Sequence, residues 1–369
     1  MKRYHFFKGR VALTAILEAL DIGPGDQVLL PGFTCVVVPN AIVYRGAEPV
    51  FLDIDPSTYN LDPDKVEAAC GTSWDPGRAK ALLVQHTFGL AADVDRLVPL
   101  ARLHDMAVVE DSCHALGSLV GDRKVGTLGD AAFFSSQWSK PVTTGLGGWA
   151  VAADEALEIE VAAVHGSMRA PSMATTTLLS TQYATYRQLF RGSLFWTLRD
   201  LYRWLSGTGL VVGSSTADEL ESRMPNDYRR TMGTPQRRRL ERHLGDDGRR
   251  RAHSRALQQK YDALVTDVGL RPLAIPEGHD PVLLRYPVEV GDKVKLLDEA
   301  RSRRIEIGDW FVSPVHPVEE PGWATAGYQA GSCPVAERAC ERIVNLPMHP
   351  GVTDRDLERI HQLLADVRG

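Results

Sequence analysis

Hydrophobic positions near the start of the chain follow a helical spacing. Leu13, Ile16, Leu17 and Leu20 fall at i, i+3, i+4 and i+7, so they lie on one face of a helix. The run Gly23-Pro24-Gly25-Asp26 then ends the helix, since glycine and proline interrupt regular structure. The pattern therefore predicts an amphipathic helix that is followed by a turn.

Short apolar runs bounded by turn residues follow this helix, and helical patterns such as Asp93–His104 separate several of them. Strands that alternate with helices predict a mostly parallel sheet between helices. Ligands bind outside the carboxyl ends of the strands in such sheets, so Asp111 and Ser135 are candidate site positions. The expected strands are Gln27–Leu30, Pro49–Asp53, Ala79–Gln85, Met106–Glu110, Ala131–Ser135 and Trp149–Ala152.

The pattern changes between about residues 161 and 226, where a Thr-rich stretch leads into a helical segment dense in aromatic residues. We interpret this region as an insertion that forms helices packed on the body of the protein or on a second subunit. A substrate lid and a helix on a membrane surface are the alternatives. The aromatic residues are Tyr183, Tyr186, Phe190, Phe195, Trp196, Tyr202 and Trp204.

The C-terminal third predicts a smaller α+β domain. Val282–Val290 has the pattern of a strand, and Lys293–Arg304 and Thr353–Val367 have the pattern of helices. A chain of 369 residues has room for a large domain and a small one. We therefore expect a large domain over residues 1–240, which includes the insertion, and a small domain over residues 241–369.

Charge and composition narrow the classes of partner. The 42 basic and 47 acidic residues give a net charge of -5, which offers no general attraction to nucleic acid or to an anionic membrane. The runs Arg237–Arg239 and Arg249–Arg251 are interpreted as solvated helix faces, with nucleic acid or a nucleotide diphosphate as alternatives. We expect small-molecule partners, no nucleic acid and no membrane.

The five cysteines are scattered and lack the Cys-x-x-Cys or Cys/His spacing of a zinc site. This usage predicts a reduced, cytoplasmic compartment and no metal. The first ten residues, MKRYHFFKGR, lack the apolar core of a signal peptide, and no apolar run is long enough to span a bilayer. We expect a soluble protein.

Two residues near strand ends have types that suit catalysis. Lys140 lies on a Ser/Thr/Gly-rich loop after an apolar strand, where burial could lower its pKa enough for Schiff-base chemistry. The alternative is an ordinary solvated lysine. Asp111 directly follows Met106–Glu110, so its carboxylate could pair with a buried cationic ring nitrogen. The alternative for Asp111 is the N-cap of a following helix.

Both residues belong to the stretch EDSCHALGSLVGDRKVGTLGDAAFFSSQWSKPVTTGLGG, and this stretch resembles sugar aminotransferases of the DegT/StrS type. The similarity runs from Gly9 to Asp154 through GPGDQVLLPGFT, GAEPVFLDIDPSTYNLDPDKVEAA, EDSCHALG, GDRKVGTLGDAAFFS and the lysine loop. It resumes near Met232 and at CPVAERACERIVNLPMHPGVTD. The resemblance implies a fold-type I pyridoxal-phosphate transferase, α/β in class, with a mostly parallel seven-stranded sheet in the large domain.

The resemblance also implies roles around the cofactor ring. Lys140 would carry pyridoxal phosphate as a Schiff base, and Asp111 would pair with the nitrogen of the pyridine ring. His114 takes the position of a family glutamine that hydrogen-bonds the ring hydroxyl. Imidazole can also donate there, although its charge state would influence the cofactor, and a core histidine is the alternative.

For the cofactor phosphate, the resemblance implies Ser135 and the motif Gly9, Arg10 and Val11. In the family, backbone amides at the start of the first helix bind the phosphate, and Gly9 permits a close approach. A capping serine and an ordinary helix start are the alternatives.

Two positions near the cofactor depart from the family pattern. The family often has an aromatic residue, stacked on the ring, where this chain has Cys35, and a sulfur–ring contact could replace that stacking. The family motif GEGG reads Gly-Leu146-Gly-Gly here, so any role of that glutamate is absent from this chain.

A third departure concerns the segment with which relatives reach the partner subunit's active site. An Asn-x-Arg motif is expected there, and this chain has Asn226 followed by Asp-Tyr-Arg-Arg-Thr-Met. If Met232 anchors the register, a threonine replaces the arginine. Arg229 or Arg230 would then supply positive charge, and the alternative for each is a solvated arginine.

The resemblance implies a homodimeric enzyme that moves an amino group from an amino acid to a nucleotide-linked keto-sugar. L-glutamate is the expected donor, and the product would serve amino-sugar, antibiotic or polysaccharide biosynthesis. The cofactor would alternate between pyridoxal phosphate and pyridoxamine phosphate with ping-pong kinetics. The alternatives are an aminocyclitol aminotransferase, a pyridoxal-phosphate-dependent sugar dehydratase, and a cofactor-binding regulatory protein without turnover.

Overall fold

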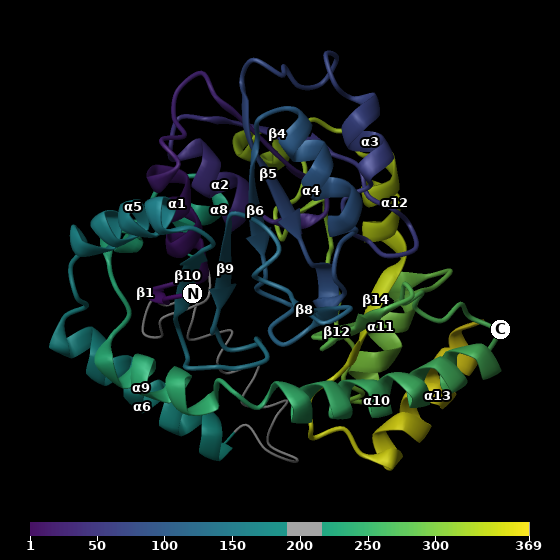
Figure 1. Cartoon of the computed structure of the whole chain (residues 1–369). Helices are drawn as coiled ribbons and strands as arrows, with labels where there is room; N and C mark the ends of the chain where they lie inside the picture. The colour runs from purple at the N-terminus through teal and green to yellow at the C-terminus, as the bar shows by residue number, and fades with distance from the viewer. Residues whose placement is uncertain (190–215, 369) are drawn as a thin grey trace.

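The computed structural model describes residues 1–189 and 216–368 of the chain. Its centre is a seven-stranded sheet with the strand order β1-β10-β9-β6-β5-β2-β4 (Figure 1). The five strands from β9 to β4 are parallel, and β10 is antiparallel to both of its neighbours. The seven strands are β1 (Tyr4–Phe6), β2 (Gln27–Pro31), β4 (Glu48–Leu52), β5 (Ala79–Gln85), β6 (Ala107–Asp111), β9 (Ala131–Ser135) and β10 (Gly148–Ala152).

The expected mostly parallel, seven-stranded sheet is therefore confirmed. Each of the six predicted strands is present, with ends that differ by at most one residue. The short edge strand β1 is an addition, and it pairs Tyr4 with Ala150 and Phe6 with Gly148.

Alternate residues of the central strands pack on opposite faces of the sheet. Leu30 and Val109 belong to a core cluster that includes α1 (Gly9–Ala19), as predicted from its apolar face. Their neighbours Leu29 and Val108 belong to a second cluster that includes residues of α4 (Val94–Leu103). Helices therefore cover both faces, because each strand is apolar on both sides.

The remaining helices lie around the sheet and below it in Figure 1, where α10 and α13 run side by side. The helix predicted from Lys293 ends at Ser302, and the one predicted from Thr353 begins at Asp354. These elements are α2 (Val37–Val43), α3 (Pro63–Ala68), α5 (Glu155–Gly166), α6 (Met173–Leu189), α8 (Ala217–Leu220), α9 (Thr234–His243), α10 (Asp247–Asp267), α11 (Lys293–Ser302), α12 (Pro334–Arg342) and α13 (Asp354–Arg368). The 3-10 helices are η1 (Thr87–Gly89), η3 (Asn226–Arg229) and η4 (Gly322–Ala326).

Short strands connect the C-terminal part of the chain to the N-terminal part. β13 (Val315–His316) pairs in parallel with β3 (Thr34–Cys35), and β11 (His279–Asp280) pairs with β7 (Leu119–Val120), which also pairs with β8 (Arg123–Lys124). The strand predicted over Val282–Val290 is β12 (Arg285–Glu289), which pairs with β14 (Ile343–Pro347). The domain boundary at residues 240/241 stays a prediction.

The described part of the insertion is helical, in α5, α6 and α8. Tyr183 is buried and Tyr186 contacts Trp138 with a centroid distance of 5.0 Å. The predicted aromatic residues Phe190, Phe195, Trp196, Tyr202 and Trp204 lie outside the described residues. Within the described ranges, no helix is both long enough and apolar enough to cross a membrane.

The two arginine runs lie on α9 and α10. Arg239 lies over the ring of Tyr183, and Arg250 and Arg251 form ion pairs with Asp247 and Asp280. Half of the run positions are therefore engaged within the protein. The expected absence of nucleic-acid binding stays a prediction.

Candidate active site

A pocket opens where the carboxyl ends of the parallel strands meet the start of α1. Asp111 and Ser135 are the last residues of β6 and β9, and Gln85 is the last residue of β5. All three line the pocket, together with Gly9, His114 and Lys140. The structure therefore brings together the sequence-predicted residues Lys140, Asp111, His114, Ser135 and Gly9, as well as Arg10 and Cys35.

Lys140 lies on a loop that connects β9 to β10 and that is held by its own hydrogen bonds. The Lys140 N–H donates to the carbonyl of Gln137 at 3.0 Å, and the Thr144 N–H donates to the carbonyl of Ser136 at 2.9 Å. The hydroxyls of Ser136 and Thr144 share a further hydrogen bond of 2.8 Å. The ammonium Nζ lies 5.2 Å from the ring centroid of Trp310.

Burial lowers the pKa of Lys140, and the carboxylate of Asp111 only partly opposes this shift. The same burial raises the pKa of Asp111, whose carboxylate accepts a hydrogen bond of 3.0 Å from the Cys113 N–H. No helix follows Asp111 before β7, so the alternative role as a helix N-cap is wrong. A buried carboxylate and a lysine with a lowered pKa in one site are typical of acid–base catalysis.

His114 lines the pocket beside these two residues and stacks on Trp310, with a centroid distance of 5.6 Å and an interplanar angle of 18°. Its Nδ1 accepts a hydrogen bond of 3.3 Å from the Phe88 N–H. Burial and the nearby Lys140 lower the pKa of His114 well below its usual range, so the imidazole is neutral. The proton of the neutral ring is then on Nε2, which has no acceptor among the described residues and can donate to a ligand.

The start of α1 packs directly against the end of β9. A Cβ atom at Gly9 would lie 3.0 Å from Cβ of Ser135, so glycine permits this close approach. Ala12 is the first residue whose N–H donates into the helix, to the carbonyl of Lys8 at 3.3 Å. The N–H groups of the three preceding residues therefore form the positive end of the helix beside Ser135.

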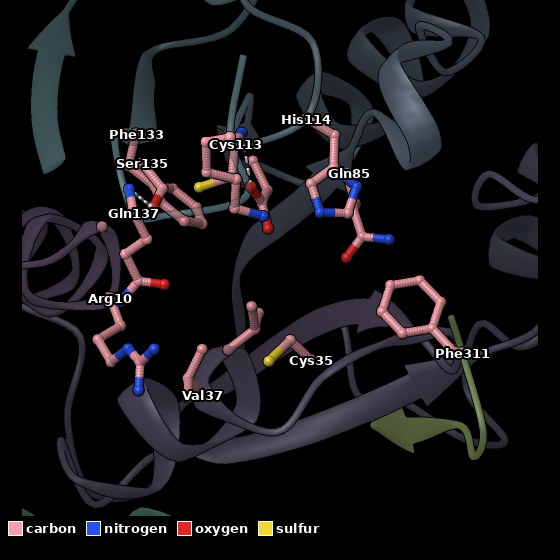
Figure 2. A pocket seen from close by; sticks show the side chains of 14 residues that line it. Arg10, Cys35, Val37, Gln85, Cys113, His114, Phe133, Ser135, Gln137 and Phe311 are labelled. Carbon is pink, nitrogen blue, oxygen red and sulfur yellow. Dashed lines mark hydrogen bonds between the residues drawn. The ribbon is translucent and has the colours of Figure 1, made fainter. Parts of the chain in front are cut away.

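Arg10 and Val11 have different surroundings. Val11 lies in the hydrophobic core and is not one of the residues that line the pocket. Figure 2 shows Arg10 on the same side of the pocket as Ser135 and Gln137. The Arg10 guanidinium forms an ion pair of 2.7 Å with Glu219, which overcomes burial and raises the pKa of Arg10.

Leu146 stands where the family has glutamate, and the structure buries it in an apolar cluster with Phe7 and Leu179. The loop shape depends on the glycines after it. A Cβ at Gly147 would lie 2.5 Å from Met232 Cε, and one at Gly148 would lie 2.4 Å from the backbone of Gly9. Where the family has a polar glutamate, this chain therefore has an apolar side chain that packs in the protein interior.

Asn226, Arg229 and Arg230 do not line the pocket of their own chain. Arg229 forms an ion pair of 2.7 Å with Glu18, and Arg230 lies 6.0 Å from the ring centroid of Phe7. Their expected contacts with a partner subunit stay a prediction. Cys35 lines the pocket, and its expected contact with the cofactor ring also stays a prediction.

One wall of the pocket consists of aromatic residues that no sequence pattern indicated. Phe311 lines it on the side opposite Arg10, as Figure 2 shows, and Trp310 stacks on His114. Gln137 was also missed, although its position three residues before Lys140 could have indicated it.

The donor set fits pyridoxal phosphate. A buried carboxylate can pair with the ring nitrogen, the orphan Nε2–H of His114 with the ring hydroxyl, and the start of α1 with Ser135 can bind a phosphate. Among the described residues, no group of three or more His, Cys, Asp or Glu side chains is arranged to hold a metal ion.

Comparison with known proteins gives concordant matches. The model of the DegT/DnrJ/EryC1/StrS aminotransferase family matches residues 7–183 and 232–365. The chain is 30% identical over 358 residues, 95% of its length and 80% of the relative's, to dTDP-4-dehydro-2,3,6-trideoxy-D-glucose 4-aminotransferase of Saccharopolyspora spinosa. It is 34% identical over 264 residues, 72% of its length and 52% of the relative's, to L-glutamine:2-deoxy-scyllo-inosose aminotransferase of Streptomyces kanamyceticus.

A solved structure has the same fold. The crystal structure of a DegT DnrJ EryC1 StrS aminotransferase from Brucella abortus matches 100% of this chain and 86% of that chain, with a TM-score of 0.74 and 24% identity.

Proposed function

The chain belongs to the DegT/DnrJ/EryC1/StrS aminotransferase family, and from this premise we propose that it transfers an amino group from L-glutamate to a nucleotide-linked keto-sugar. It is a pyridoxal-phosphate-dependent aminotransferase. The relatives act on nucleotide-linked sugars and on a cyclitol, as their names state. The observation that carries the proposal is one pocket that holds Lys140, Asp111, His114 and Ser135 at the start of α1.

When bound, pyridoxal phosphate supplies an electron sink for the amino-group transfer. Lys140 is the residue that attaches to it, since burial favours the neutral, nucleophilic amine. The Nζ atom of Lys140 would accept a proton from the α-carbon of the donor and would return it to the carbon on the other side of the transferred nitrogen. Asp111 would keep the ring nitrogen protonated, and His114 would donate to the ring hydroxyl through Nε2.

The start of α1 and Ser135 would hold the phosphate group at the other end of the pocket. Arg10 adds positive charge there, although Glu219 balances it. The proposed assembly is a homodimer in which Asn226 and Arg229 or Arg230 approach the partner subunit's site. We place the enzyme in the cytoplasm, in line with its unpaired cysteines.

The test is a half-reaction. L-glutamate added to the purified holoenzyme should remove the visible absorbance of the lysine-bound cofactor and produce pyridoxamine phosphate and 2-oxoglutarate. Lys140→Ala should lack that absorbance and catalytic turnover, whereas Lys80→Ala, at an exposed position of β5, serves as the matched control. Normal turnover by the Lys140 variant would refute the proposal.

The named alternatives have distinct outcomes. A regulatory protein without turnover would keep its absorbance with every amino acid. A reverse assay with amino-sugar nucleotides and aminocyclitols separates the two kinds of aminotransferase. The dehydratase is disfavoured because relatives with that activity carry histidine where this chain has Lys140.

A further inference from the structure

Arg285, the first residue of β12, lies beside the aromatic wall of the site and is not one of the residues that line the pocket itself. Its Cζ atom is 5.8 Å from the ring centroid of Trp310, and Lys140 Nζ is 5.2 Å from the same centroid. Burial is the main cause of the low pKa values of Lys140 and His114, and the positive charge of Arg285 lowers both further. Arg285 therefore lies close enough to the reacting lysine to influence its charge.

The protein itself gives Arg285 few partners. The side chain is 24% exposed, and its closest carboxylate oxygen, on Glu306, is 3.9 Å away. The carboxylate of Glu306 is hydrogen-bonded to His349 at 2.9 Å. Within residues 1–189 and 216–368, the guanidinium of Arg285 makes no hydrogen bond, so its N–H groups are available to a ligand.

The place of Arg285 indicates which ligand it meets. The start of α1, Ser135 and Arg10 occupy one side of the pocket, and Phe311 occupies the opposite side (Figure 2). Arg285 lies over Trp310, whose ring centroid is 6.1 Å from that of Phe311. It is therefore on the Phe311 side of the site, away from the residues that suit the cofactor phosphate. A ligand at Arg285 would therefore lie near Lys140, where the amino group of the donor must react.

We propose that Arg285 binds a carboxylate of the amino-acid donor and so determines which amines react at Lys140. A planar guanidinium pairs with a carboxylate through two parallel hydrogen bonds, which fixes the orientation of the donor as well as its position. The α-carboxylate and the side-chain carboxylate of glutamate share this chemistry. This inference rests on the proposed function.

A binding experiment tests the contact without any reaction. Glutarate has two carboxylates and no amino group, so calorimetric titration of the holoenzyme with glutarate measures carboxylate binding alone. Arg285→Gln should weaken glutarate binding about 10- to 100-fold, and Arg285→Lys should weaken it less because the charge remains. Arg342→Gln removes an exposed arginine of α12 that pairs with Glu289, the last residue of β12, and it should leave glutarate binding unchanged.

Half-reactions with three donors identify the carboxylate. If Arg285→Gln slows conversion of the cofactor by glutamate, glutamine and alanine alike at limiting donor, Arg285 binds the α-carboxylate. If it slows conversion by glutamate alone, Arg285 binds the side-chain carboxylate. Either result supports the inference, provided that the variant binds pyridoxal phosphate as the wild type does.

Other outcomes overturn it. Unchanged glutarate affinity in Arg285→Gln would make Arg285 a structural partner of Glu306. Weaker binding of inorganic pyrophosphate with unchanged glutarate binding would assign Arg285 to the acceptor's phosphates. Failure of the wild-type protein to react with any amino acid would instead refute the proposed function, so the two failures are distinguishable.

Discussion

Nδ1 of His114 accepts a hydrogen bond from the backbone N–H of Phe88, at a distance of 3.3 Å. Phe88 has a positive φ of 56° and lies in η1, directly after β5. The contact places the proton of the neutral imidazole on Nε2, because the acceptor nitrogen cannot carry it. A histidine can therefore replace the family's glutamine as a donor without adding a charge.

The first prediction concerns this donor. His114→Phe keeps a planar ring beside Trp310 and removes the hydrogen bond to the ring hydroxyl of the cofactor. We expect a rise of about one unit in the pKa of the lysine-bound cofactor, because the lost hydrogen bond stabilised the charged ring oxygen of its deprotonated form. Spectra recorded against pH measure it, and His114→Gln, which retains a donor, should titrate as the wild type does. Equal curves for all three proteins would exclude the hydrogen bond.

The second prediction concerns the buried ion pair between Arg10 and Glu219. Glu219 is fully buried and lies 3.9 Å from Lys8 as well. Lys8 keeps its 2.8 Å ion pair with Asp227 in Glu219→Gln, whereas Arg10 loses its carboxylate partner. Breaking this buried pair should reduce the free energy of unfolding of the apoprotein by about 3–5 kcal/mol. Urea denaturation measures the loss. Glu221→Gln, in an exposed pair with Arg223, should cost about 1 kcal/mol or less.

The same variant probes the phosphate end of the pocket. Because Arg10 lines the pocket, a bound phosphate should replace part of the missing negative charge. Pyridoxal phosphate should therefore raise the melting temperature more in Glu219→Gln than in the wild type. An equal rise in both would show that Arg10 does not sense the cofactor phosphate.

The sheet could be predicted from the sequence because each strand is an apolar run bounded by turn residues. Asp111 and Ser135 were found for the same reason, since they end β6 and β9. The edge strand β1 has only three residues and forms through pairing with β10, a contact that no local pattern encodes.

The aromatic wall was not predictable in this way. Trp310 and Phe311 lie in a loop without hydrophobic periodicity, nearly two hundred residues after His114 in the chain. Their loop is held by Lys293, whose ammonium donates to the carbonyls of Asp309 and Phe311 at 3.2 Å and 3.0 Å. Only the tertiary structure brings this loop and Arg285 to Lys140.

The third prediction concerns Leu146, which the structure buries against Phe7 and Leu179. Leu146→Ala should reduce the free energy of unfolding by about 2–5 kcal/mol, because it leaves a cavity between the lysine loop and α6. Leu103→Ala, at a position 75% exposed, is the control and should change it by about 0.5 kcal/mol or less. Leu146→Glu should be worse than Leu146→Ala, since it buries an unpaired carboxylate. A stable, active glutamate variant would contradict the apolar packing.

The fourth prediction concerns Gly148, where a Cβ would lie 2.4 Å from the backbone of Gly9. Gly148→Ala should push the start of α1 away from Ser135, destabilise the protein by about 1–3 kcal/mol and weaken cofactor binding. Titration of the apoprotein with pyridoxal phosphate measures the affinity. Gly166→Ala, where a Cβ has no neighbour within 4 Å, is the matched control. If the Gly148 variant is destabilised but binds pyridoxal phosphate with wild-type affinity, the start of α1 does not contribute to phosphate binding.

The last prediction concerns His316 in β13 and the stability of the folded protein at acidic pH. Burial lowers the pKa of His316 from its usual 6.5 to about 4, with Lys293 and Lys140 contributing to the shift. Between these pH values the unfolded chain binds a proton at His316 that the folded protein does not bind. The contribution of His316 to the free energy of unfolding is therefore fully present above pH 6.5 and is lost as the pH falls toward 4. His316→Gln should therefore lose less stability on acidification than the wild type, by up to about 3 kcal/mol. Urea denaturation across this pH range measures the difference, and parallel stability curves for the two proteins would show that His316 does not carry it.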